Sequence, residues 1–197
     1  MMGMVIGVRL VDLNRTRFTG VPKQPGVYFV CWVRNGKPVP IQRLLSVDKN
    51  GILYIGSTKA KAGLRGRLRQ LWNSVKKARE GKGTGPHTFG PTLVYTSLIS
   101  RNNRKGIKID ELVVWFKAYD DGRYAEAQEK RAIYEYTNRY GEPPPLNLRV
   151  GRRYLAIVGL AEAGKSIPAP KLDPELEKII TGMCSLGIKI FSTEIDA

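Results

Sequence analysis

The chain has 197 residues, with 33 Lys and Arg against 17 Asp and Glu, for a net charge of +16. This length supports one sizeable hydrophobic core, and two cysteines are too few for a disulfide framework, so we expect an intracellular, cytoplasmic protein with reduced thiols. No apolar run approaches the length of a membrane span, and residues 1–13, interrupted by Arg9, predict a strand rather than a signal peptide.

The positive charge is unevenly distributed. From Pro168 onward three basic residues face five acidic ones, a net of −2, so the preceding part carries +18. A field of this size concentrates polyanions, and phosphate backbones are the commonest target. The charge therefore favours a nucleic-acid partner, although a solubility charge or a general affinity for RNA would look the same.

Residues 26–33 (GVYFVCWV) predict a strand of β-branched and aromatic residues. Because side chains alternate along a strand, Tyr28, Val30 and Trp32 should point to one face and the other apolar residues to the opposite face. Both faces are apolar, so we predict a central strand.

A second predicted strand, Ile52–Ile55, follows an Asn-Gly turn signal and stops at Gly56, where a side chain would crowd an approaching ligand. Pairing of the two strands would hold Tyr54 near Tyr28. A tyrosine in a strand is most often a packed amphipathic residue, so neither tyrosine alone indicates a site.

A helix is predicted over residues 64–79, and its apolar stripe consists of Leu64, Leu68, Leu71, Trp72 and Val75. Arg65 and Arg67 fall about equally far to either side of this stripe, so periodicity does not choose between them. An arginine here is often a solvated charge, but its planar guanidinium also suits a transition state that gathers negative charge on phosphorus.

The second main helix is predicted over residues 123–140, with Ala125, Ala132, Ile133, Tyr136 and Tyr140 as its stripe. Glu129 falls in the middle of that stripe. A carboxylate there is costly unless a buried arginine, a tyrosine hydroxyl or a metal ion pairs with it.

The remaining predicted elements follow hydrophobic pattern and turn signals. They are a possible edge strand in 4–13, an irregular connection over 35–51, a Gly- and Lys-rich loop over 81–90, a short helix or strand over 92–100, a basic turn over 101–106, a third strand over 110–119, a helix over 172–183 and a last strand over 188–195.

Five elements in this order resemble the GIY-YIG nuclease family: Gly26-Val27-Tyr28, Tyr54-Ile55-Gly56, the arginine-bearing segment 63–68, Glu129, and Pro145-Leu146-Asn147. The resemblance covers roughly residues 25–147. It implies an α/β (α+β) domain, over residues 1–150, with a small three-stranded mixed or antiparallel sheet flanked by helices. We expect residues 151–197 to form a C-terminal extension with a helix.

The resemblance implies metal-dependent endonuclease activity of a restriction, repair or homing type. Tyr28 would help to deprotonate the attacking water, with its phenol activated by nearby cations, and Tyr54 would position water or phosphate. Arg67, with Arg65 as the alternative, would stabilise the pentacovalent phosphorus. Glu129 would bind Mg²⁺ or Mn²⁺, and Asn147 would hold a loop or the neighbouring groups by hydrogen bonds.

The sequence departs from the family pattern in two places. The connection over 35–51 is longer than usual, and Leu71 occupies the place, one turn after the arginine, where some members carry a histidine. The only histidine is His87, in the 81–90 loop. The expected contacts to nucleic acid are Lys59, Arg65, Arg69, His87, Arg101, Arg104 and Lys105.

DNA is favoured over RNA as the substrate, and a homodimer is compatible with the double-strand cuts that such enzymes make. Two other hypotheses remain at this point: a non-catalytic nucleic-acid-binding protein on the same fold, and a self-association module with a basic surface. Residues 159–166 fit a phosphate-binding loop pattern. Prolines follow at once instead of a helix, so we do not expect nucleotide binding.

Overall fold

A computed structural model describes residues 6–82, 87, 89–99, 106–147 and 171–182 of the chain. The main sheet is antiparallel, with β2 (Gly26–Arg34) at its centre between β6 (Ile52–Thr58) and β7 (Leu112–Ala118). These are the three predicted strands, and β2 is the central one, as its two apolar faces indicated.

The sheet is larger than the three strands expected. β1 (Ile6–Arg9) pairs with β7, and the two-residue strand β3 (Lys37–Pro38) pairs with the end of β2, which makes five strands. A separate hairpin, formed by β4 (Ile41–Gln42) and β5 (Val47–Asp48), lies within the long 35–51 connection. The mixed α/β class is confirmed, and the three-stranded sheet is corrected to five.

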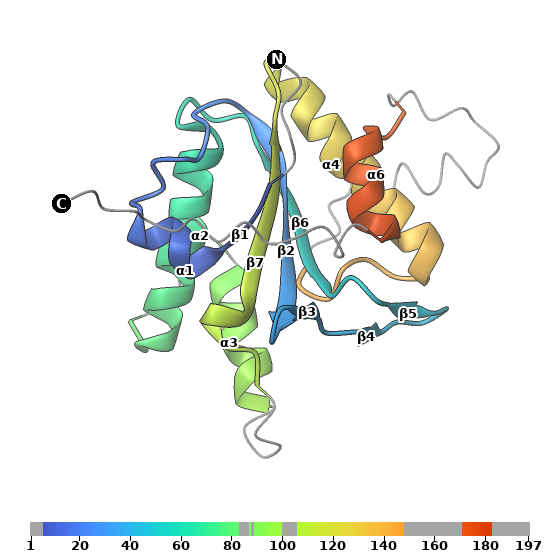
Figure 1. Cartoon of the computed structure of the whole chain (residues 1–197), viewed down its shortest axis with the longest axis horizontal. Coiled ribbons are helices and arrows are strands. Elements are labelled where there is room, and N and C mark those ends of the chain that lie inside the picture. The colour runs from blue at the N-terminus through green and yellow to red at the C-terminus, as the bar shows by residue number, and fades with distance from the viewer. Residues whose placement is uncertain (1–5, 83–86, 88, 100–105, 148–170, 183–197) are drawn as a thin grey trace.

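Helices cover both faces of the sheet (Figure 1). On one face lie α1 (Leu10–Arg15), α2 (Gly63–Arg79) and α3 (Phe89–Ile99), which share a hydrophobic cluster with Tyr28 and Val30. On the other lie α4 (Gly122–Tyr140) and α6 (Pro174–Thr181), against Val27, Phe29 and Cys31. The predicted alternation of β2 side chains is therefore confirmed.

The predicted strand over residues 4–13 is only partly correct, because the chain turns into α1 after Arg9. Asp12 accepts hydrogen bonds from Arg9 Nε (2.6 Å) and Arg15 Nη1 (3.2 Å), while Leu10 and Leu13 are buried. These local ion pairs and two buried leucines favour one short helix where weak alternation predicted strand.

The buried stripe of α4 differs from the prediction by one position. Gln128 is fully buried, Ile133 is only half-buried, and Glu129 is half-buried at the margin instead of central. Gln128 Nε2 donates to the carbonyl of Lys171 (3.0 Å), and its Oε1 accepts from the amide of Asp173 (2.9 Å). The helix is thus rotated so that the amide of Gln128, and not the carboxylate of Glu129, packs against residues 171–173.

The chain after residue 171 packs on the main body through α6, which falls within the helix predicted over 172–183. Leu176, Ile179 and Ile180 are buried in the second cluster. Lys117 of β7 forms ion pairs with Asp173 (2.7 Å) and Glu175 (2.6 Å) at the start of α6. The predicted strand over 188–195 and the rejected nucleotide-binding pattern over 159–166 lie outside the described residues.

Candidate active site

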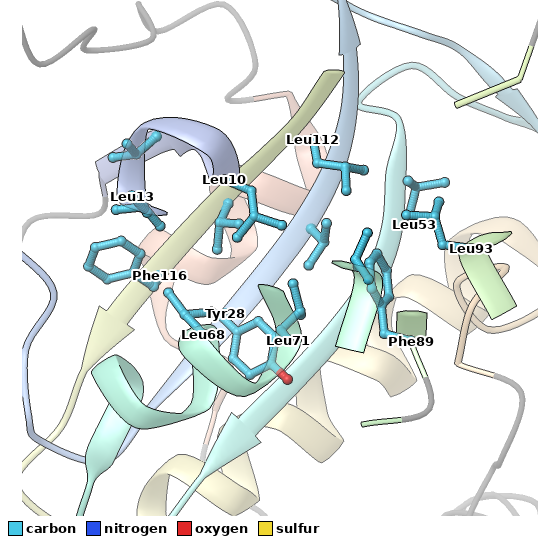
Figure 2. Packing of buried hydrophobic residues seen from close by; sticks show 14 of the residues in the cluster. Leu10, Leu13, Tyr28, Leu53, Leu68, Leu71, Phe89, Leu93, Leu112 and Phe116 are labelled. Atoms are coloured by element: carbon cyan, nitrogen blue, oxygen red, sulfur yellow. The ribbon is translucent and has the colours of Figure 1, made fainter. Parts of the chain in front are cut away.

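Pairing of β2 with β6 brings the two tyrosines together. Tyr28 lies directly opposite Gly56, and its ring centroid is 6.0 Å from that of Tyr54. A Cβ atom on residue 56 would lie 2.6 Å from Tyr28 Oη and 2.7 Å from Tyr54 Cε1, so only glycine fits between them. The ring of Tyr28 is buried among Leu68 and Leu71, with its hydroxyl at the border of the cluster (Figure 2).

The structure brings Arg67, not Arg65, to the tyrosines. Arg67 Nε donates a hydrogen bond to Tyr28 Oη over 3.2 Å. Arg65 donates instead to the carbonyls of Val21 (2.8 Å) and Thr19 (2.6 Å). Two residues along an α-helix are rotated by about 200°, so the two side chains leave α2 in nearly opposite directions.

His87, which the sequence predicted as a loop residue, lies beside Tyr28. Its Nε2 lies 2.9 Å from Tyr28 Oη, although 59 residues separate the two in sequence. The side chain is 2% exposed, which differs from the surface loop contact to phosphate that we expected. Ser74 of α2 anchors the segment by donating its hydroxyl to the His87 carbonyl (2.5 Å).

The hydrogen-bond pattern assigns the neutral tautomer of His87. Its Nδ1 accepts from the amide of Phe89 (3.1 Å), so the proton resides on Nε2, which donates to Tyr28. Burial, and then the charge of Arg67, lower the pKa of His87 to about 3. Tyr28 Oη therefore accepts two N–H donors, one from His87 and one from Arg67.

Glu129 reaches this group across the open edge of β6, which pairs only with β2 among the described strands. Ser57 Oγ donates a hydrogen bond to Glu129 Oε2. Burial raises the pKa of the Glu129 carboxyl, against the opposing effects of Ser57 and Arg67. The same carboxylate also raises the pKa values of Tyr28 and Tyr54, so it lies within electrostatic reach of both phenols.

Asn147 holds the backbone of the second tyrosine strand. Its Oδ1 accepts from the amide of Ile55 (2.9 Å) and its Nδ2 donates to the carbonyl of the same residue (2.8 Å). Leu146 adds a backbone bond to the Leu53 carbonyl (2.9 Å). The asparagine thus pairs the free edge of β6 between Tyr54 and Gly56, which is the type of supporting task that we expected of it.

Burial dominates the ionisation of both phenols. It raises the pKa of Tyr28 well above its usual value, with a further rise from Tyr54, and Arg67 lowers it only in part. Burial and then Glu129 raise the pKa of Tyr54. Arg67 lowers the pKa of Tyr28, in the direction expected of a nearby cation, but in the free protein the effect of complete burial is larger.

The other predicted cations are more scattered. Lys59 is exposed and pairs with Glu126 (3.1 Å), one helical turn before Glu129. Arg69 is exposed, donates to the carbonyl of Arg17 (3.3 Å) and lies over the ring of Phe18. Arg101, Arg104 and Lys105 lie outside the described residues.

The oxygen donors at the β6 edge fit a hard cation. Mg²⁺ keeps most of its hydration and commonly takes one or two carboxylates together with substrate phosphates. Glu129 supplies a carboxylate whose one hydrogen bond from the described residues comes from Ser57. No cluster of three His, Cys, Asp or Glu residues able to hold a metal occurs in the described part of the chain, which excludes there the closed cage typical of zinc.

Comparisons with known proteins found no matching family model, no curated relative and no similar solved structure. Among the helices in the described ranges, none is long and apolar enough to cross a membrane.

Proposed function

We propose that the protein is a metal-dependent endonuclease that hydrolyses phosphodiester bonds in nucleic acid, with DNA favoured over RNA. The supporting observation is the convergence of two phenols, one guanidinium and one carboxylate at the open edge of β6. Tyr28 and Tyr54 pack together, Arg67 bonds Tyr28, and Glu129 is electrostatically coupled to all three. Phosphodiester hydrolysis uses this set: groups that orient water, a cation for the phosphorane and a ligand for a metal ion.

Arg67 is the proposed stabiliser of the transition state. Its Nε is engaged by Tyr28, which fixes the direction of the guanidinium plane. Both terminal nitrogens would then bind two oxygens of the scissile phosphate. Coupling to Tyr28, Tyr54 and Glu129 raises the pKa of Arg67 despite its burial, so the positive charge persists at every working pH.

Tyr28 would orient the attacking water and accept its proton when the phenol is ionised. Two N–H donors on Oη, from Arg67 and His87, stabilise the phenolate. Because burial raises the pKa of Tyr28, the ionised fraction is small at neutral pH. Cleavage rates should therefore increase with pH from 6 to 10, about tenfold per unit where ionisation limits the rate, in single-turnover assays.

Glu129 and Ser57 would hold Mg²⁺ or Mn²⁺ at the β6 edge. When bound, such an ion neutralises charge on the leaving oxygen. Because the pKa of Glu129 is raised, protons compete more strongly with the metal for this carboxylate than for an ordinary glutamate as the pH falls. Binding of Mn²⁺, followed by its paramagnetic effect on water relaxation, should weaken as the pH falls and should be lost in Glu129→Gln.

The test is nicking of supercoiled plasmid in the presence of Mg²⁺. The native chain should convert supercoiled to open-circular DNA, and Glu129→Gln should reduce the rate by a factor on the order of 10² or more. Glu135→Gln is the matched control, because Glu135 lies on the same helix but pairs with Arg131 at the surface. Equal cutting by the native chain and Glu129→Gln, or no cutting of any DNA or RNA tested, would refute the enzyme.

One observation favours a second candidate, a non-catalytic nucleic-acid-binding protein on the same fold. The described residues offer a single carboxylate at the site, and burial keeps both phenols protonated. This alternative predicts salt-sensitive binding of DNA without cleavage at any pH or with any divalent ion.

A further inference from the structure

The loop that joins β4 to β5 presents an apolar tip to solvent. Leu44 is 74% exposed and Leu45 69%, and Val47 beside them is 40% exposed. Among the described residues, the only other large hydrophobic side chain with such exposure is Tyr124. Single exposed leucines are ordinary, but two adjacent ones at the end of a projecting hairpin form a small continuous apolar surface. We call residues 43–46 the hairpin tip.

The hairpin tip is held firmly by the end of α4. The amide of Leu45 donates to the Tyr140 carbonyl (3.0 Å), and the amide of Leu44 to Glu142 Oε1 (3.0 Å). Arg43 donates to the Pro143 carbonyl (2.5 Å) and pairs with Glu142 (3.3 Å). These bonds fix the leucines outward, so the tip is a preorganised projection and not a loose loop.

Gly141 makes this arrangement possible. It ends α4 with φ of +81°, and a Cβ there would lie 2.6 Å from Leu45 Cγ. Beneath the tip, Asp48 is fully buried and accepts hydrogen bonds from the amides of Asn50 and Ile52 (both 2.8 Å) and from the hydroxyl of Tyr136 (3.0 Å). The base of the hairpin is therefore as well anchored as its tip.

A positively charged groove adjoins the tip. It runs between β3, β5 and the end of α4, and its charged side chains are Lys37, Lys49 and Arg139. All three are exposed and form no ion pair with any described residue, and none of the described residues that line the groove is acidic. The nearby Glu142 is neutralised by Arg43. The groove therefore has the charge that suits a phosphate backbone.

We propose that the hairpin tip and this groove bind a nucleic-acid duplex, with Leu44 and Leu45 inserted as a wedge against a base step and the three cations on the adjacent phosphates. Leucine is one of the side chains that proteins insert between base pairs when they bend DNA. A concave groove beside a projecting tip matches a strand backbone next to an opened step, whereas a flat membrane would not enter the groove. Two leucines are also too small an area for a stable dimer, which needs about 1,000 Å² in total.

The position of the hairpin allows one duplex to reach both sites. Figure 1 shows β4 and β5 extending away from the main sheet, beyond the end of β2 that pairs with β3. Arg34, at that end, is six residues beyond Tyr28, which is about 20 Å along a strand. About six base pairs of duplex span the same length. This inference takes its substrate from the proposed nuclease, but it concerns binding and is testable without cleavage.

The test uses a 30-base-pair DNA duplex with 2-aminopurine at central steps, in EDTA so that no cleavage occurs. Binding of the native chain should increase the fluorescence, because the base is unstacked. The double variant Leu44→Ser/Leu45→Ser should lose this increase and bind about tenfold or more weakly. Tyr124→Ser is the control for loss of an exposed apolar side chain and should leave both signals unchanged.

The cations are tested separately by the salt dependence of binding. Lys37→Gln/Lys49→Gln/Arg139→Gln should reduce the slope of log affinity against log salt by about 2 to 3, since each phosphate contact contributes about 0.9. The control Lys77→Gln/Lys171→Gln/Lys178→Gln removes the same charge from exposed lysines elsewhere and should change the slope by less than half as much.

Three outcomes would overturn the proposal. Equal duplex affinity and equal 2-aminopurine signal in the leucine variant would show that the tip does not touch DNA. A shift from dimer to monomer in that variant by sedimentation would assign the tip to a second copy of the chain. Leucine-dependent binding to phosphatidylserine vesicles, without duplex binding, would assign it to a membrane surface. A chain that binds as expected but never nicks plasmid would refute the nuclease and leave the wedge supported.

Discussion

The polar cluster around Lys117, on one face of the sheet, and the polar cluster around Tyr28, on the other, differ in what sets the ionisation of their side chains. On the α4 and α6 face, Lys117 is enclosed by Asp173 and Glu175, and Tyr119 donates to Asp173 (3.1 Å). Burial disfavours the charges there, but hydrogen bonds and ion pairs outweigh it, raising the pKa of Lys117 and lowering that of Asp173. Lys117 and Asp173 are thus stabilised in their charged forms.

In the cluster around Tyr28, and at the adjoining β6 edge, burial has the larger effect on the pKa values. It raises the pKa values of Tyr28, Tyr54 and Glu129 and lowers that of His87. Groups held away from their preferred ionisation are typical of functional sites, whereas fully paired charges are typical of structural attachment. Substitutions in the cluster around Tyr28 should therefore change mainly the cleavage rate, and those in the cluster around Lys117 mainly the free energy of unfolding.

The largest effect is expected at Arg67. Replacement by Ala should reduce the nicking rate by a factor of about 10² to 10³, because the phosphorane loses its cation. The free energy of unfolding should change little, since burial of the guanidinium is itself unfavourable. Rates and urea melts measured on the same samples separate the two quantities. A loss of stability with normal activity would show that Arg67 supports the fold and not the reaction.

Lys117→Met should reduce stability and leave the nicking rate nearly unchanged. It leaves Asp173, whose side chain is 10% exposed, without its cation, and the free energy of unfolding should fall by about 3 kcal/mol. At a temperature where the variant is folded, nicking should remain near the native rate. Lys178→Met, an exposed lysine on α6, should change stability by less than about 0.5 kcal/mol.

The pH dependence of stability tests the protonation state of His87. Its pKa is about 3 in the folded protein, against about 6.5 when unfolded, so between these values the unfolded chain binds one more proton. The contribution of His87 to the free energy of unfolding is therefore fully present above about pH 6.5. It decreases as the pH is lowered, by up to about 1.4 kcal/mol per pH unit. His87→Gln should lack that component in urea melts from pH 7.5 to 4.5. Parallel curves would mean that folding does not lower the pKa of the His87 imidazole.

The smallest effect is expected at Arg65. Arg65→Gln removes hydrogen bonds to the carbonyls of Thr19 and Val21 and should lower the free energy of unfolding by about 1 kcal/mol. The nicking rate should stay within about twofold of the native rate. A loss of activity like that of Arg67→Ala would reverse the assignment of the two arginines.

Sequence patterns predicted the parts of the molecule that depend on local periodicity. The apolar run around Tyr28 required a central strand, and the stripe from Leu64 to Val75 required a helix against the sheet. The pattern predicted Glu129 at the centre of the buried stripe of α4, but Gln128, the preceding residue, occupies that place. The rotation of α4 is set by Gln128 and its bonds to residues 171–173, which are distant in sequence.

The position of His87 could not be predicted from the sequence. The Gly- and Lys-rich loop around it predicted exposure, and the contact to Tyr28 depends on the packing of α3 against α2 and on the anchor at Ser74. One signal was present: a lone histidine followed closely by Phe89, whose ring packs edge-on to it with centroids 6.3 Å apart. The choice of Arg67 over Arg65 also required coordinates, because both flank the same stripe.

The attachment of α6 has a consequence for synthesis of the chain. Val27 and Phe29 emerge from the ribosome long before Leu176 and Ile179, which share their hydrophobic cluster. Until those later residues appear, part of this layer of the nascent protein stays open to water and to neighbouring chains. Chaperones that recognise apolar surface would engage the protein at that stage, and closure of α6 would end the engagement.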